Sequence, residues 1–297
     1  MPRVLNRQIL LQIAVLLLAT GFVAAKLLET RGLARFGWPG LEAGIVVALV
    51  PLNLGLEVVK WRRLTGRAWG EAWRDVLAGA AAGFVSPNRA GDGLARVIRL
   101  PRGLRERGAR AAMNGAAAQG WVTLAGGGIG LLALGRPAAG AAVCALALVG
   151  LAVLLFWSPS LRAEPRRRWM QRVARWLSKH VARDQRGPIP ARRRLEIVGW
   201  SALRYAVFTG QYLGMLAAFD VKERAAAVAV VWLVNAAVPT GALAEFGVRE
   251  ASALAVMQPA GAAVAGVVAA TFALWMLNLL IPGLLGIKHL RTGDGNE

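Results

Sequence analysis

Two short polar segments interrupt an otherwise apolar chain and decide the predicted fold: SPNRAGDGLAR at residues 86–96 and PTGALAEFGVRE at residues 239–250. We call them the first and second polar segments. Each lies between two apolar runs, and each run is about half as long as the roughly 20 residues that a membrane-spanning helix needs. Both segments contain residues that break helices, namely Pro87 with Gly91 and Pro239 with Gly241. The pattern predicts two re-entrant helical hairpins, at residues 72–100 and 225–257.

Each polar segment also carries an acidic residue four positions before an arginine, which places the two charges on one face of a helix. The pairs are Asp92–Arg96 and Glu245–Arg249. Charges at membrane depth are costly and are functional by default. The alternative is that these pairs are structural and only hold the hairpins together.

Arginine presents a planar fork that suits phosphate oxygens, and the free N–H groups at a helix start favour an anion. The segments therefore predict a binding site for the phosphate of a lipid, with acids that balance the arginines or carry a proton. The predicted substrate-binding residues are Arg89, Asp92, Arg96, Glu245, Arg249 and Glu250. Two further charged residues in predicted spans, Glu57 and Arg204, are secondary candidates.

The composition excludes an ordinary soluble domain, because 56% of the 297 residues are hydrophobic and the mean hydropathy is +0.48. The net charge is +20, but the basic residues fall in short loops between apolar runs. Membrane topology and anionic lipids explain that placement better than nucleic acid does. The single cysteine, Cys144, allows no internal disulfide. No metal-binding or enzyme motif is present in the sequence, so we expect no cofactor, no metal and no enzymatic activity.

The apolar runs predict an all-α polytopic membrane protein that forms a single membrane domain over residues 1–297. Its six full spans are predicted at residues 9–28, 41–59, 111–134, 138–157, 195–217 and 261–283. The glycine-rich run at 126–130 favours close contact between helices. Residues 159–194 are basic, with apolar residues at helical spacing, which predicts an amphipathic helix on the cytoplasmic surface of the membrane.

The positive charges predict the orientation. With both termini in the cytoplasm and both hairpins returning to their side of entry, 28 Lys and Arg residues lie on the cytoplasmic side and 6 lie outside. The same topology divides the chain into residues 1–135 and 136–297, each with two spans, a hairpin and a span. The second half starts on the opposite face, so the halves form a predicted inverted repeat, which is a recurrent plan in transporters.

The motifs resemble a known family, the flippase-like transmembrane domain of lysylphosphatidylglycerol synthases, which also occurs in stand-alone bacterial and archaeal membrane proteins. The resemblance rests on KWRRL at 60–64, PNRAGD at 87–92 with Arg96, and FGVRE at 246–250 after Pro239. The sequence departs from the family at Asp92, where glutamate is usual, and at 242–245, where a paired glycine is usual. The resemblance implies a stand-alone member without the synthase domain, which handles or translocates lipid in the bacterial cytoplasmic (inner) membrane.

Three functional hypotheses follow from the sequence. The first is a translocase that moves an anionic phospholipid or a polyprenyl-phosphate-linked lipid between leaflets. The second is a non-transporting membrane partner that scaffolds a lipid- or glycan-modifying enzyme through the basic segment at 159–194. The third is an intramembrane transferase that acts on a polyprenyl phosphate.

Overall fold

The computed structural model describes residues 40–86, 89–156, 189–238, 244–258 and 263–290. Every regular element in these ranges is a helix, which confirms the all-α class. The helices are α2 (Leu41–Thr65), α3 (Trp69–Val85), α4 (Ala90–Ile98), α5 (Arg105–Ala133), α6 (Pro137–Phe156), α8 (Ala191–Ala218), α9 (Ala225–Ala237), α10 (Ala244–Met257), α11 (Val264–Trp275) and α12 (Ile281–Gly286). Short turns of other helix types lie at Arg102–Leu104 (η2), Met276–Leu280 (η4) and Ile287–His289 (η5).

Four of these helical stretches are long and apolar enough to cross a membrane: Leu41–Thr65, Arg102–Ala133, Pro137–Phe156 and Val264–His289. They coincide with four of the six predicted spans. A fifth, α8, has 28 residues but a less apolar sequence, so its crossing stays a prediction. The predicted span at 9–28, both chain termini and most of the basic segment at 159–194 lie outside the described residues. The last residues of the basic segment, from Ala191 onward, belong to α8.

The outer face of α6 supports a membrane environment. Only Gly140, Ala147 and Leu154 of this helix are buried, whereas Leu148 is 69% exposed and Phe156 is 85% exposed. A soluble protein rarely exposes apolar surface on this scale. These side chains are therefore placed to face lipid.

Each predicted hairpin contains two helices. The first consists of α3 and α4, with 17 and 9 residues, and the second of α9 and α10, with 13 and 14 residues. At about 1.5 Å per residue, each helix is shorter than the roughly 30 Å hydrocarbon core of a bilayer. Re-entry into the membrane from one side stays a prediction.

Three of the four predicted helix breakers, Pro87, Pro239 and Gly241, lie outside the described residues. Gly91 does not lie in the break, because α4 begins one residue before it. A Cβ atom at Gly91 would lie 2.5 Å from the carbonyl oxygen of Ala82, so this glycine lets α4 approach α3 closely.

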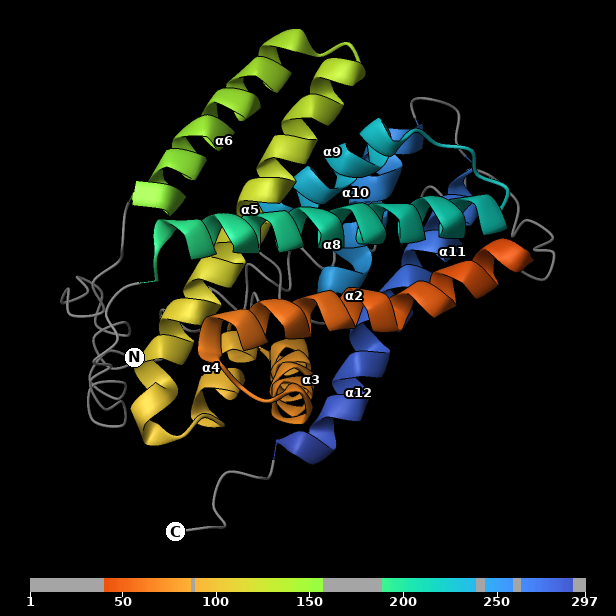
Figure 1. The fold of residues 1–297 in the computed structure, drawn as a ribbon. Helices are drawn as coiled ribbons and strands as arrows, with labels where there is room; N and C mark the ends of the chain where they lie inside the picture. The colour runs from red at the N-terminus through yellow and green to blue at the C-terminus, as the bar shows by residue number, and fades with distance from the viewer. Residues whose placement is uncertain (1–39, 87–88, 157–188, 239–243, 259–262, 291–297) are drawn as a thin grey trace, which may run out of the picture.

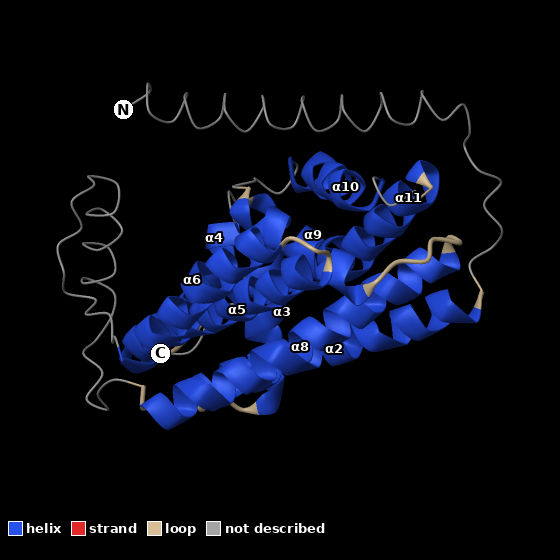
Figure 2. Ribbon diagram, turned by 90° about the horizontal axis from the view of Figure 1, so that it is seen from above, coloured by secondary structure: helices blue, strands red, loops and turns tan. Residues whose placement is uncertain are grey.

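Two long helices, α2 and α8, lie side by side along one side of the described helices (Figures 1 and 2). Both predicted hairpins lie on the same side of this helix pair (Figure 2). In the first hairpin α3 packs against α12, and in the second α9 packs against α5.

Glycines permit both of these contacts. On α5, Cβ atoms at Gly127 and Gly130 would meet Leu233 and Ala226 of α9. On α12, Cβ atoms at Gly283 and Gly286 would meet Phe84 and Leu77 of α3. The glycines are three residues apart in each case, and their partners are seven residues apart. The inverted repeat of the two halves stays a prediction.

Candidate functional site

Glu57 on α2 lies at the centre of an ionic cluster between helices. Its Oε2 atom lies 2.9 Å from Nζ of Lys60, one helical turn further along. Its Oε1 atom accepts a hydrogen bond of 2.9 Å from Nη1 of Arg96 on α4. Nε of Arg204 on α8 lies 3.7 Å from the Oε2 atom. Glu57 and Arg204, the two secondary candidates, are thus in contact.

The first polar segment contributes the other side of the cluster. Nε of Arg96 donates a hydrogen bond of 2.6 Å to Oδ1 of Asp92, so the predicted pair forms. Nη2 of Arg89 lies 3.8 Å from Oδ2 of Asp92. On α3, a Cβ atom at Gly79 would collide with Asp92 and Arg96, so the absence of a side chain there makes room for this pair.

The six charged residues described so far form the Glu57 cluster: Glu57, Lys60, Arg89, Asp92, Arg96 and Arg204. Neutral groups on other helices complete it. Lys60 donates a hydrogen bond of 3.2 Å to Oγ of Ser201 on α8, and Arg204 donates one of 3.3 Å to Oε1 of Gln119 on α5. Residues from α2, α4, α5 and α8, which are far apart in sequence, therefore meet at one site.

Exposure differs within the cluster. The side chains of Lys60 and Arg96 are only 3% and 9% exposed, and both make short contacts to carboxylates. The side chains of Arg89 and Arg204 are 34% and 30% exposed, and their carboxylate contacts are too long for hydrogen bonds. The cluster thus has a buried inner part, in which Lys60 and Arg96 bind carboxylates closely, and two partly exposed arginines, Arg89 and Arg204.

The sequence analysis did not name Lys60 as a site residue, although Lys60 is the first residue of the KWRRL motif at 60–64. The spacing of Glu57 and Lys60, three residues apart, was the available signal. In the structure Lys60 is buried in the cluster rather than exposed at the membrane surface.

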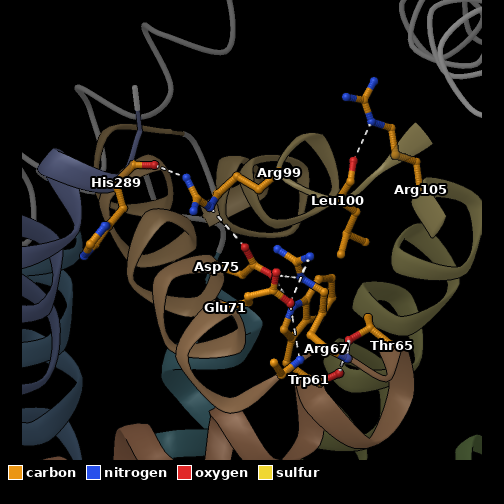
Figure 3. Close-up of polar contacts among 10 residues, drawn as sticks. Trp61, Thr65, Arg67, Glu71, Asp75, Arg99, Leu100, Arg105 and His289 are labelled. Carbon is orange, nitrogen blue, oxygen red and sulfur yellow. Dashed lines mark hydrogen bonds and ion pairs between the residues drawn. The ribbon is translucent and has the colours of Figure 1, made fainter. Parts of the chain in front are cut away.

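A second ionic cluster surrounds Asp75 on α3, which is fully buried (Figure 3). Nε1 of Trp61, Nε of Arg67 and Nε of Arg99 donate hydrogen bonds of 3.1, 3.2 and 3.0 Å to its carboxylate. Arg67 also pairs with Glu71 at 3.1 Å. We call Arg67, Glu71, Asp75 and Arg99 the Asp75 cluster.

The Asp75 cluster joins separate segments and holds as many acids as bases. Arg99 also donates a hydrogen bond to the carbonyl oxygen of His289, which ties the end of α4 to the end of the last helix. Trp61 connects the two clusters, because the guanidinium of Arg96 lies 5.7 Å from the centroid of its ring. The four-residue spacing of Arg67, Glu71 and Asp75 was an available signal, whereas nothing in the sequence indicated the contact between Arg99 and Asp75.

A neutral hydrogen-bond network joins α2, α8 and η4. Nδ2 of Asn53 donates to Oδ1 of Asn278 at 2.6 Å and to Oε1 of Gln211 at 3.4 Å. Gln211 donates in turn to the carbonyl oxygen of Val46 at 3.2 Å. These amides act as contacts between helices, which is the usual role of such residues in membrane spans.

The second polar segment lies on a different pair of helices. Glu250 on α10 is 1% exposed, and neither carboxylate oxygen has a hydrogen-bond partner in another described residue. Arg249 beside it is partly buried, and the side chain of Glu245 is outside the described residues. The ion pairs of the Glu57 cluster come from α2, α4 and α8, whereas α10 packs against α9 and α11. The meeting of both polar segments in one site therefore stays a prediction.

Among the described residues, no group of three or more His, Cys, Asp or Glu side chains is arranged to hold a metal ion. No protein-family model matches the sequence, and no curated protein matches it. The resemblance to the flippase-like family thus stays a prediction. The fold and the site together define a class: a helical membrane protein with a charged cluster buried between its helices.

Proposed function

We propose that the protein is a membrane lipid translocase that carries an anionic, phosphate-bearing lipid head group between leaflets. One observation supports the proposal. Helices from both halves of the chain contribute to one charged cluster, and cations outnumber carboxylates in that cluster. The described ion pairs contain four cations, Lys60, Arg89, Arg96 and Arg204, and two carboxylates, Glu57 and Asp92.

An excess of positive charge away from bulk water is costly unless an anion balances it. Arginine is the residue best suited to bind phosphate through paired hydrogen bonds. Because α4 follows a helix break and α8 belongs to the other half of the chain, movement of one half relative to the other would change which side the cluster faces. This is the geometry that alternating access requires.

The test is translocation of fluorescent phospholipids by the purified protein in liposomes. The wild type is expected to move an anionic phospholipid faster than protein-free liposomes do, and Arg204→Gln is expected to reduce that rate at least about tenfold, in line with the loss of one charged contact. Arg63→Gln is the matched control, since Arg63 is 48% exposed and lies outside the cluster. No movement of any lipid by a folded, correctly inserted wild type would contradict the proposal.

A further inference from the structure

We infer that the Glu57 cluster selects a head group with two negative charges, a phosphomonoester, over a phosphodiester that carries one. The inference deepens the proposed function and rests on it for the identity of the ligand as a lipid. It comes from the charge balance and the contact lengths within the cluster.

The inner charges of the cluster compensate one another. Lys60 and Glu57 are 2.9 Å apart, and Arg96 and Asp92 are 2.6 Å apart. Arg96 also binds Glu57 at 2.9 Å, so the four groups form one connected and neutral set. No charge of these four is left for a ligand.

Arg89 and Arg204 remain as the excess of two positive charges. Among the described residues, Arg89 makes only the 3.8 Å contact to Asp92, and no side-chain hydrogen bond joins it to another of them. Arg204 donates one hydrogen bond, to Gln119, while its buried Nε atom has no hydrogen-bond partner. A guanidinium has five N–H donors, so both arginines keep donors that the described residues do not use.

The two arginines contact one connected pair of carboxylates: Arg89 lies near Asp92, Arg204 lies near Glu57, and Arg96 binds both acids. Arg204 lies within electrostatic range of both Arg89 and Arg96, and these like charges repel one another. The backbone of Arg89 is in the left-handed region, with φ of 54°, which is unfavourable for a residue other than glycine. Strained backbone of this kind concentrates at ligand-binding positions.

The Asp75 cluster shows that this excess is not a general property of the protein. Its ion pairs contain two cations, Arg67 and Arg99, and two carboxylates, Glu71 and Asp75. The two clusters share Trp61 as a neighbour. The balanced cluster needs no ligand, whereas the Glu57 cluster needs two negative charges, and one phosphomonoester dianion supplies them.

The experiment compares phosphatidic acid with phosphatidylmethanol of the same acyl chains, because methylation removes one negative charge and changes little else. Binding to the purified protein in nanodiscs is measured at pH 8, where the phosphomonoester is doubly ionised, its second pKa being about 6. Phosphatidic acid is expected to bind about tenfold or more tightly, a difference of about 1.4 kcal/mol. Arg204→Gln and Arg89→Gln should each reduce this ratio, and the double variant should bring it close to one.

Arg204→Lys is the charge-preserving control and should keep most of the preference, while Arg63→Gln should keep all of it. Equal binding of the two lipids by the wild type would overturn the inference and leave the proposed translocation standing. A clear preference without translocation in liposomes would contradict the proposed function and keep the inference about charge. Glycerol 3-phosphate is the third probe: if it bound as tightly as phosphatidic acid, the ligand would be a soluble phosphate ester and the lipid part of the inference would be wrong.

Discussion

At the scale of single residues, Glu250 is a carboxylate buried between helices. Its carboxylate is buried, and no other described residue donates a hydrogen bond to it. We expect Glu250→Gln to raise the free energy of unfolding by about 1 kcal/mol or more, because a neutral amide is cheaper to bury than a carboxylate that accepts no hydrogen bond. Thermal unfolding in detergent measures this effect.

The control for Glu250 is Glu71→Gln, which removes a carboxylate that is 46% exposed and paired with Arg67. Exposed ion pairs contribute little, so this change should shift stability by less than about 1 kcal/mol. If Glu250 contributes to transport as predicted, Glu250→Gln will lower the translocation rate while raising stability. A lower melting temperature for Glu250→Gln would contradict this account of its environment.

Residue patterns predicted part of the site. The four-residue spacing of Asp92 and Arg96 was sufficient to predict their pairing, because it depends only on helix geometry. The contacts from Glu57 to Arg96 and Arg204 join positions 39 or more residues apart. No local periodicity specifies such contacts, so the sequence indicated only that both residues deserved attention as charges within apolar runs.

At the scale of elements, the fit of α4 against α3 depends on glycine. We expect Gly79→Ala to displace the Asp92–Arg96 pair, since the added methyl group would collide with both side chains. Such overpacking typically costs about 1–3 kcal/mol, and the translocation rate should fall with it.

Gly70→Ala is the matched control on the same helix, because nothing lies within 4 Å of its Cβ position. It should leave transport unchanged and stabilise α3 by up to about 1 kcal/mol through helix propensity. Unaltered transport and stability in Gly79→Ala would show that α4 does not pack against α3 as described. The sequence predicted a helix break between these helices but placed Gly91 in the break, because a glycine needed for close packing looks the same as one needed for a turn.

At the scale of the whole molecule, the Asp75 cluster connects the first hairpin to the ends of α2 and of the last helix. Asp75→Ala would leave Arg67 and Arg99 without their shared carboxylate. We expect a loss of about 3–5 kcal/mol, the usual cost of removing one partner from a buried ion pair. Asp75→Asn should lose less stability, since the amide oxygen can still accept one hydrogen bond. Chemical or thermal unfolding of both variants would show whether Asp75→Ala is the less stable one.

The glycine-rich run at 126–130 indicated a close contact of α5 with another helix, and the structure identifies that helix as α9. The contact of α3 with α12 was not predicted from the sequence. Hydropathy predicted four spans that the structure contains as long apolar helices. It did not indicate which helices would be neighbours, because packing between apolar helices depends on shape rather than on apolar content.

The most direct test of the central claim, that the Glu57 cluster holds a lipid phosphate, is an experimental structure of the protein in nanodiscs that contain phosphatidic acid. The account predicts a head group between Arg89 and Arg204, with phosphate oxygens about 2.7–2.9 Å from guanidinium nitrogens, and loss of that density in Arg204→Gln. Lipid found only around the outer faces of the helices, with no head group at Arg89 or Arg204, would contradict it.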